Sequence, residues 1–589
     1  MPLFARVGLS RLACNPFVNQ RHFHRAIGAR STLRAKLLMT GVVLFGGGAT
    51  SGSLHAQTST MQPLPAAVES AKQIETDPLN VVLEDGAALE IDRRWTEAIR
   101  HYEKAFRDFP NSRQVYQRLI ICRLHADVNR RYRDRSFVDS VHQMTAAQAL
   151  DLYSEILSNL ETHYVEHVDW SRVFLHGTAA LEIALTENRY VTDVLPEADQ
   201  EKVHQFQQTI HRRISNRPTN GRHDLRAAVA TVAELARNEI GLSPTAVVLE
   251  YVSGAVSTLD PYTRLLSGDQ LDDMFSNIEG NFVGLGVELR PSTDSLEILS
   301  VIPNGPAEEA GLKAGDRIVR VEQADTRTGK PEIAADLLRG PEDSFVSIAV
   351  QTSEGAEREY NIARRRVEVP CVENVHICDP SNGVGYLRLT NFQKTTPRDV
   401  EQAIWQLQQQ GMRSLIMDLR GNPGGLLSAA VDIADRFLSQ GRIVTTRGRN
   451  SRENFDYVAH RTKTLSFPLA VLIDNDSASA SEIFAGAMSD SGRGVIVGQR
   501  SYGKGSVQGI FRMQAAKFGL CLTTAKFYSP NGTAISQRGV FPDVPVESQY
   551  IAARPNDEGE IVTDLDDEVM QQAIGQLSGQ SQLISQRTR

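Results

Sequence analysis

Residues 415–425 read LIMDLRGNPGG, a short apolar run that ends in a glycine-rich turn. A helical pattern continues from this turn to Phe437, and the arrangement recurs when the apolar run 470–473 leads through a second turn into a helix ending near Met488. A third apolar run, 495–497, follows. Strands that alternate with helices predict βαβ units around a largely buried parallel sheet. Catalytic groups of such sheets gather where strands run into helix N-termini.

The two turns offer the elements of an oxyanion hole, because each can present backbone N–H groups at neighbouring strand ends. One turn lies at Gly424 and Gly425, and the other lies in the run SASAS at residues 477–481. Each serine of that run is also a reasonable helix N-cap residue. Taken singly, each is structural by default.

A lysine between two glycines follows the third apolar run, in the sequence RSYGKGSVQ at residues 500–508. If residues 506–511 form a strand, Lys504 and Gln508 share a face at period two. Desolvation can lower the pKa of a lysine from about 10.4 towards about 7–8, and Lys504 could then act as a neutral general base on a serine. Gln508 could orient its amine.

Two other motifs use the same residues. Residues 498–504 fit most of a phosphate-binding loop, but Gly505 stands where the metal-binding Ser or Thr belongs, and a strand-like run follows instead of a helix. Residues 501–504 match the Ser-x-x-Lys of penicillin-binding enzymes, which requires a helix. Glycines at 503 and 505 argue against that helix.

Upstream, residues 280–367 resemble a PDZ domain, with short β-rich runs, a short helix from Pro306 and a second helix expected at 333–338. The resemblance includes the turn GLKAGD at 311–316 and a carboxylate-binding loop made of Gly284, Leu285, Gly286 and Val287. In PDZ domains the N–H groups of this loop hold a terminal carboxylate, and the bound peptide adds a strand to the sheet. The alternative is that Gly284 and Gly286 are ordinary turn or bulge glycines of a small β-barrel.

The region before the PDZ-like segment is helical. Residues 142–265 show apolar positions at helical spacing, which predicts a helical domain. Residues 81–137 resemble a tetratricopeptide unit followed by a partial second one. The positions that carry this resemblance are Gly86, Leu89, Ala98, Tyr102, Ala105 and Pro110. A generic helical hairpin is the alternative.

The N-terminus indicates export. Seven basic residues precede the apolar run 37–50, and the first carboxylate of the chain is Glu69. We therefore expect an export signal peptide over residues 1–56, a linker over 57–80, and a folded part in the periplasm or cell envelope. An uncleaved membrane anchor is the alternative.

Residues 549–589 form an acidic tail in which residues 564–577 could be helical.

Composition excludes several classes of protein. The net charge of −8 gives no reason to expect nucleic-acid binding. No Cys or His pair has zinc-site spacing, so we expect no metal and no cofactor. Cys371 and Cys378 flank residues 372–377, which could form a small hairpin closed by a disulfide, although two buried thiols are equally consistent with the sequence.

Residues of about 142–548 resemble the carboxy-terminal processing peptidases, also called tail-specific proteases. The motifs that carry the resemblance, in the family order, are TLDPY at 258–262, the PDZ-like segment, LRGNPGG at 419–425, SASASE at 477–482, YGKGSVQ at 502–508 and LTTAKFY at 522–528. The helical stretch between residues 182 and 244 and the tetratricopeptide-like unit depart from the family pattern.

The resemblance implies a catalytic Ser479, a general base Lys504 placed 25 residues later, and Gln508 placed four residues beyond that. It further implies a crotonase-like peptidase core over residues 368–548, in which the amide of Ala480 and that of Gly424 or Gly425 hold the oxyanion.

We therefore expect a multidomain α+β protein with a helical N-terminal region, a PDZ β-barrel and a crotonase-like α/β core. The expected function is that of an exported serine endopeptidase acting on proteins whose C-terminal tails the PDZ domain captures. The alternative is a non-catalytic envelope scaffold that binds partners through its tetratricopeptide-like and PDZ modules. A protein adaptor on the tetratricopeptide-like unit and a homo-oligomer are further expected partners.

Overall fold

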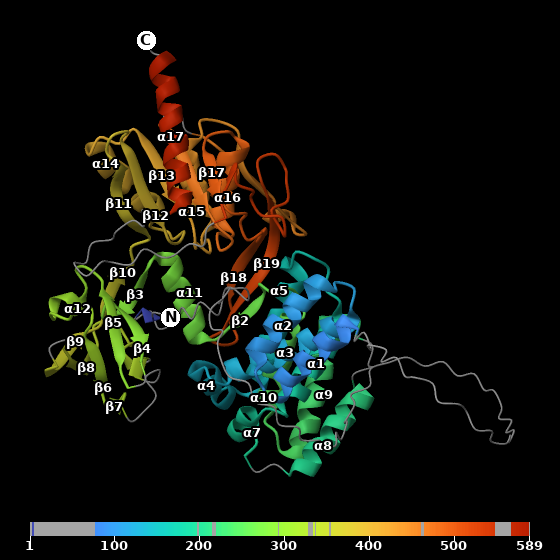
Figure 1. Ribbon diagram of the computed structural model, residues 1–589. Coiled ribbons are helices and arrows are strands. Elements are labelled where there is room, and N and C mark those ends of the chain that lie inside the picture. Colours follow the sequence, from blue (N-terminus) through green and yellow to red (C-terminus); the bar gives the residue numbers. More distant parts are fainter. Residues whose placement is uncertain are drawn as a thin grey trace, which may run out of the picture.

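The computed structural model describes residues 3–4, 77–196, 199–214, 219–292, 294–327, 334–335, 337–352, 355–460, 464–547 and 567–587 (Figure 1). Helices form the N-terminal part and sheets dominate the rest, so the chain is a mixed helical and sheet protein. Apart from the two-residue strand β1 (Leu3–Phe4), the expected signal peptide lies outside the described residues, as does most of the expected linker. Among the residues described, no helix is long and apolar enough to cross a membrane.

Within the described residues, α-helices α1 to α10 form the N-terminal part, and they gather on one side of the molecule in Figure 1. They are α1 (Pro78–Ile91), α2 (Trp95–Asp108), α3 (Arg113–Arg131), α4 (Arg135–Gln143), α5 (Ala146–His163), α6 (Trp170–Ala184), α7 (Asn188–Val194), α8 (Gln200–Thr209), α9 (Arg222–Ile240) and α10 (Pro244–Ser257), with a π-helical turn η1 (Ile210–Ile214) after α8. Residues 245–256 of α10 are all buried, so α10 is the centre of this helical core. Its apolar sequence accounts for that position, because a helix that is apolar all round must be buried.

Helices α6 and α10 cross in direct backbone contact. A Cβ atom on Gly254 would lie 2.5 Å from the Cα and 2.7 Å from the backbone nitrogen of Gly177. Only glycine permits so close an approach, and the two helices then pack without an intervening side chain.

The first three helices form a smaller unit with its own apolar cluster. A Cβ on Gly86 of α1 would lie 2.2 Å from the ring of Tyr102 on α2, which explains a small residue at that position. The buried Glu187 carboxylate joins this unit to α7, because it accepts hydrogen bonds from Arg93, His125 and Asn129. Its resemblance to a tetratricopeptide unit stays a prediction.

The segment that resembles a PDZ domain contains an antiparallel sheet ordered β4-β5-β6-β8-β9, to which β1 adds beside β4 and β7 beside β6. A separate antiparallel pair joins β3 and β10. The strands are β3 (Asn281–Gly284), β4 (Val287–Pro291), β5 (Leu296–Val301), β6 (Arg317–Val321), β7 (Ala324–Asp325), β8 (Phe345–Gln351), β9 (Glu357–Ala363) and β10 (Arg365–Glu368), with helices α11 (Gly268–Glu279) and α12 (Pro306–Glu309). The second helix expected at residues 333–338 lies partly outside the described residues.

A six-stranded sheet ordered β11-β12-β13-β16-β17-β20 follows, and its strands from β12 onward pair in parallel as the sequence predicts. Its strands are β11 (Val372–Asp379), β12 (Val384–Leu389), β13 (Ser414–Asp418), β16 (Leu469–Ile473), β17 (Val495–Gly498) and β20 (Val544–Pro545). Helices α14 (Thr396–Gln409), α15 (Leu427–Phe437) and α16 (Ala480–Asp490) cover one face. Helix α17 (Glu568–Arg587) covers the other, where Val569, Ala573 and Leu577 are buried (Figure 1).

A long hairpin links this sheet to the helical part. Its strands β18 (Ser506–Arg512) and β19 (Gly519–Tyr528) belong to a second sheet with β14 (Arg442–Gly448), β15 (Phe455–Val458) and β2 (Arg264–Leu266), and a 3-10 turn η2 (Ser451–Glu453) precedes β15. Phe518, Leu520 and Leu522 of the hairpin are buried in the helical core. Figure 1 shows the hairpin reaching the helices.

The hairpin suggested between Cys371 and Cys378 is wrong, because residues 372–379 form the single strand β11. A strand rises about 3.3 Å per residue, which separates the two cysteines by roughly 20 Å. A disulfide requires Cα atoms about 4.4–6.8 Å apart. Both thiols are free, and burial raises the pKa of each to about 11.

The crossing of α6 and α10 yields a stability prediction. Gly254→Ala places a methyl group against the Gly177 backbone, and overpacking of this kind costs about 1–3 kcal/mol. We expect a clearly lowered temperature of thermal unfolding, measured by circular dichroism. Gly575→Ala in α17 is the matched control, because a Cβ there meets nothing within 4 Å and helix propensity favours alanine. An unchanged unfolding temperature in Gly254→Ala would contradict the predicted packing.

Candidate active site

The turn that follows β13 is held by hydrogen bonds that its backbone N–H groups donate. Its N–H groups donate as follows: Arg420 to Asp418 Oδ1 at 2.9 Å, Gly421 to both Asp474 oxygens at 3.0 Å, Asn422 to the Leu419 carbonyl at 3.1 Å, and Gly424 to Asn422 Oδ1 at 2.9 Å. The buried Asn422 side chain also donates to the Leu389 carbonyl at 2.7 Å. The turn is therefore held from within and from β12.

The second turn, between β16 and α16, is tied to the first. The Ala478 N–H and the Ser481 hydroxyl both donate to the Asn422 carbonyl at 3.0 Å. The Ser477 hydroxyl donates to the Leu419 carbonyl at 2.9 Å. Two of the three serines thus hold one turn against the other, a structural role different from the N-cap expected for each, and the N-cap residue of α16 is Ser479.

Ser479 differs from Ser477 and Ser481 in its backbone conformation. It precedes α16 with φ 56° and ψ −112°, a region that costs an ordinary residue about 1–3 kcal/mol. Strain of this size persists only where the surroundings enforce it, and it is common at functional sites.

The first turn touches Ser479 directly. A Cβ atom on Gly424 would lie 2.8 Å from the Ser479 Cβ and 2.8 Å from the Ala480 nitrogen. A Cβ on Gly425 would lie 2.0 Å from the Phe392 carbonyl oxygen. Both glycines have positive φ, at 99° and 144°, so side chains are excluded from both positions by sterics and by backbone conformation.

Two backbone N–H groups beside Ser479 remain available. Within the described part of the chain, neither the Gly425 N–H nor the Ala480 N–H has a hydrogen-bond partner, whereas the Gly424 N–H donates to Asn422. Ala480 is 1% exposed, and because buried N–H groups are nearly always paired, its unpaired N–H is unusual, whereas Gly425 is exposed and its N–H is open to water. Unpaired N–H groups of this kind can bind an anion or a carbonyl oxygen.

A buried carboxylate joins the serine to the lysine loop. Glu482 is 1% exposed and accepts four hydrogen bonds: from the Ser479 N–H at 2.8 Å, the Lys504 N–H at 2.9 Å, the Gly503 N–H at 2.6 Å and the Ser501 hydroxyl at 2.6 Å. Burial raises the pKa of Glu482, and the hydrogen bonds counteract this rise because they favour the charged form. The sequence analysis assigned this residue no role, although Ser-x-x-Glu at 479–482 has capping-box spacing.

Lys504 lies beside an aromatic ring from the helical part. Its Nζ is 5.2 Å from the ring centroid of Tyr262, which belongs to the motif at 258–262. The hydroxyls of Tyr262 and Tyr502 share a hydrogen bond, and burial raises the pKa of both. The sequence analysis noted the motif without a role for Tyr262.

Gln508 lies further along the same loop and strand. Its Nε2 donates to the Ser506 hydroxyl at 2.9 Å and to the Thr523 hydroxyl at 3.4 Å. Lys504 precedes β18, which begins at Ser506, and the pairing register shifts between Val507 and Gln508. The period-two argument that placed both side chains on one strand face therefore does not apply, and the role of Gln508 stays a prediction.

The loop proposed to bind a carboxylate lies between β3 and β4. The carbonyl oxygens of Leu285 and Gly286 accept hydrogen bonds from Ala307 and Ile302, each at 2.8 Å. Among the described residues the N–H groups of Leu285 and Gly286 have no partner. Gly286 has φ 79°. Val287 begins the strand β4, which pairs with β5 on one side and with the two-residue β1 on the other.

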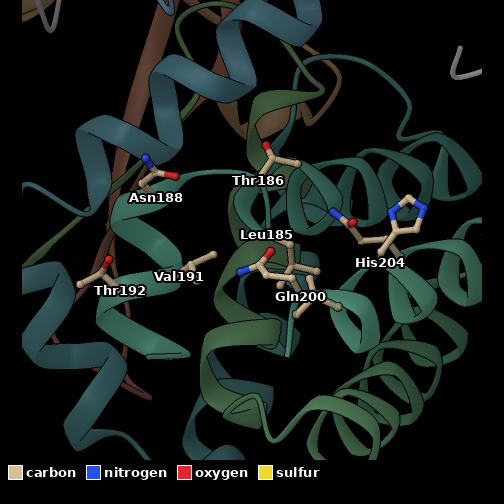
Figure 2. A pocket seen from close by; sticks show the side chains of 9 residues that line it. Leu185, Thr186, Asn188, Val191, Thr192, Gln200 and His204 are labelled. Atoms are coloured by element: carbon tan, nitrogen blue, oxygen red, sulfur yellow. The ribbon is translucent and has the colours of Figure 1, made fainter. Parts of the chain in front are cut away.

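A hollow of about 320 Å³ lies elsewhere, between α7 and α8 (Figure 2). Thr186, Asn188, Thr192, Gln200 and His204 are among its lining residues. It contains neither a serine nor a lysine, and the side chains named here are exposed. No cluster of three or more metal-binding side chains occurs in the residues that the structure describes.

Comparison with known proteins identifies the family. A model described as peptidase family S41 matches residues 383–546, and a PDZ domain model matches residues 297–352. The carboxyl-terminal-processing protease of Synechocystis sp. is 36% identical over 303 residues, which cover 50% of this chain and 70% of that protein. The carboxy-terminal-processing protease of Bartonella bacilliformis is 35% identical over 303 residues, which cover 50% of this chain and 68% of that protein.

Among solved structures, a photosystem II D1 C-terminal processing protease aligns with 72% of this chain and 100% of its own, at 25% identity and a TM-score of 0.37. The two sequence relatives are each matched over more than two thirds of their length. This chain therefore belongs to the carboxyl-terminal-processing protease family and is a serine-type peptidase with a PDZ domain.

Proposed function

We propose that this chain is an exported serine endopeptidase in which Ser479 is the nucleophile and Lys504 the general base. The observation that carries the proposal is the Glu482 carboxylate, which accepts the backbone N–H groups of both residues and so fixes the two loops together. Of the three serines in the run 477–481, the other two use their hydroxyls in hydrogen bonds to the backbone.

The mechanism follows the usual course of acyl transfer. Neutral Lys504 accepts the Ser479 hydroxyl proton while the serine oxygen attacks the scissile carbonyl carbon. The protonated lysine then gives that proton to the leaving amine as the C–N bond breaks. Water, deprotonated by the same lysine, hydrolyses the acyl-enzyme. No cofactor enters these steps.

For the oxyanion we favour the N–H groups of Gly425 and Ala480. The Gly424 N–H already donates to Asn422 Oδ1, so Gly424 contributes its small size and its positive φ instead. Preorganised donors of this kind are worth about 2.7–4 kcal/mol each in other serine peptidases. We further propose a crotonase-like core over residues 368–548, with Gln508 supporting the base through the hydrogen-bonded loop around Ser506.

The PDZ domain would capture the C-terminal tails of substrate proteins. The N–H groups of Leu285 and Gly286 would hold the terminal carboxylate. The tail would add as a strand beside β4, in the place that β1, part of the expected signal peptide, occupies in the structure. Such capture raises the local concentration of cleavable segments near the peptidase site. Protein or peptide substrates suit a peptidase with a PDZ domain.

Domain organisation and location complete the proposal. We propose a tetratricopeptide-like unit over residues 81–137, which would hold a protein adaptor, and a helical domain over 142–265. The PDZ domain would span 280–367, and the acidic tail 549–589. Export to the periplasm or cell envelope rests on the basic and apolar pattern of residues 1–56, and assembly into a homo-oligomer is part of the same proposal.

Ser479→Ala and Lys504→Ala should each lower kcat on an unfolded protein substrate by about 10⁴-fold or more, because the nucleophile or its base is lost. Substrate cleavage followed by gel electrophoresis measures this. Ser481→Ala is the matched control, because it loses one hydrogen bond, to the Asn422 carbonyl, worth about 1 kcal/mol. It should retain turnover within about tenfold. Full turnover by Ser479→Ala would refute the assignment.

Glu482→Gln tests the link between the two loops. Its amide NH2 cannot accept hydrogen bonds, so either the Gly503 N–H or the Ser479 and Lys504 N–H groups lose their acceptor, and both arrangements loosen the lysine loop. Each unmet donor costs about 1–3 kcal/mol, and we expect kcat to fall about 10–100-fold together with the unfolding temperature. Glu401→Gln, on the exposed face of α14, is the control and should match wild type. Wild-type kcat in Glu482→Gln would contradict this role.

Tail capture predicts a dependence on the substrate's terminal carboxylate. Amidation of a peptide substrate's C-terminus removes a charge-assisted hydrogen bond worth about 1.5–3 kcal/mol, so KM should rise about 10–100-fold while kcat changes little. Steady-state kinetics on the free and the amidated peptide measure both constants. Equal KM values for the two peptides would exclude capture through the carboxylate.

A further inference from the structure

Tyr262 reaches the peptidase site from the helical part of the chain. It lies in the segment between α10 and β2, two residues after Asp260. The Asp260 carboxylate accepts the N–H groups of Tyr262 and Thr263 at 2.9 and 3.0 Å, and also the Thr263 hydroxyl at 2.6 Å. The segment is therefore a rigid turn.

The hairpin β18–β19 holds this turn against the lysine loop. The Thr523 hydroxyl donates to Asp260 Oδ1 at 2.9 Å, and the Thr523 N–H donates to the Thr263 hydroxyl at 3.1 Å. Gln508 follows Lys504 by four residues, and its Nε2 lies 3.4 Å from the Thr523 hydroxyl. Asp260 thus fixes Tyr262 to the same hairpin that continues from Lys504.

The ring of Tyr262 presents its face to the lysine amine. The Nζ of Lys504 is 5.2 Å from the ring centroid, within the range of about 6 Å for a cation–π contact. On its other side the Tyr262 hydroxyl meets Tyr502, and the buried environment keeps both phenols neutral, because burial raises the pKa of each. The ring is therefore a neutral π surface held beside the amine.

Such a surface discriminates between the two protonation states of lysine. The negative face of the ring attracts an ammonium and has little effect on a neutral amine. In the proposed reaction Lys504 becomes an ammonium when it takes the Ser479 proton. The ring would stabilise this charged state. In the free enzyme, Lys504 would therefore become a neutral base only at a higher pH than without the ring.

We propose that Tyr262 is a positioning residue for the peptidase reaction, supplied by the helical part of the chain, whose ring face holds Lys504 and stabilises its protonated form. This inference rests on the proposed role of Lys504 as the base. The charged groups that act on this cluster are Glu482, whose carboxylate accepts the Lys504 N–H, Asp260, whose charge acts on Tyr262, and Glu103 of α2, whose charge acts on Tyr502.

The pH profile of kcat/KM tests the proposal, because its acidic limb reports the pKa of the base in the free enzyme. Tyr262→Leu removes the ring, so the acidic limb should move to lower pH by about 0.5–1 unit, a shift consistent with a cation–π contact of moderate strength. At its plateau kcat should fall, since the ammonium that develops in the transition state loses the attraction of the ring. Tyr262→Phe keeps the ring and should retain the wild-type limb.

A structural role alone would lower activity at every pH without moving the limb. The inference is overturned if Tyr262→Leu has the wild-type limb, or if Tyr262→Phe shifts it as far as Tyr262→Leu does. If Tyr262→Leu loses the native unfolding transition, Tyr262→Met replaces it, because methionine fills similar space without a π face. It should then show the same downward shift, and an unmoved limb overturns the inference.

Failure of the proposed dyad gives a different result. If Lys504→Ala retains wild-type turnover, the lysine is not the base and the proposed function itself fails. If Lys504→Ala is inactive while the limb is unmoved in the ring-deleted variant, only the role of Tyr262 is refuted.

Discussion

The arrangement of the candidate active site depends on one buried carboxylate. Glu482 receives hydrogen bonds from both sides of the site, from the turn that carries Ser479 and from the loop that carries Lys504. Burying a carboxylate is unfavourable unless its oxygens are hydrogen-bonded, and the four donors meet that condition. The same hydrogen bonds stabilise the buried charge and set the separation of the two loops. The fixation uses the backbone N–H groups of the two proposed reacting residues.

The backbone strain at Ser479 belongs to the same arrangement. Ser479 adopts a positive φ because its N–H must reach Glu482 while the Ala478 N–H reaches Asn422. With those two N–H groups used, the N–H of Ala480 is left without a partner in the described residues, next to that of Gly425. The glycines 424 and 425 let the first turn approach the turn that carries Ser479 closely. The N–H groups of Gly425 and Ala480, which we propose as the oxyanion donors, are those that the other hydrogen bonds leave over among the described residues.

Local patterns predicted much of this fold from sequence, and long-range contacts account for what was missed. The apolar runs before the turns at 421–425 and 474–478 predicted β13, β16 and the parallel sheet, because the period and the glycines are local signals. The capping-box spacing of Ser479 and Glu482 predicts one hydrogen bond within the turn, yet nothing local shows that the same carboxylate reaches Gly503 and Lys504. The expected strand at 506–511 is present as β18, but the period-two argument for Lys504 and Gln508 does not extend to the lysine, because β18 begins at Ser506 and its register shifts after Val507. Tyr262 is more than 200 residues from Lys504 in the chain, and only the folded hairpin brings them together.

That hairpin changes how the helical part should be understood. A module attached by a linker would leave the peptidase site complete without it, but here β2 of the helical part pairs with β19, and the Val165 N–H donates to the Thr523 carbonyl at 2.9 Å. Leu520 and Leu522 are buried in the helical core, so the hairpin that follows Lys504 gets part of its packing from outside the peptidase sheet. Arg449, after β14, adds hydrogen bonds to carbonyl groups at the end of α5. Because these contacts span both parts, a displacement of the helical core would be transmitted to the turn at 260–263 and from there to the ring beside Lys504. The helical part and the peptidase sheet thus form one structural unit around the site.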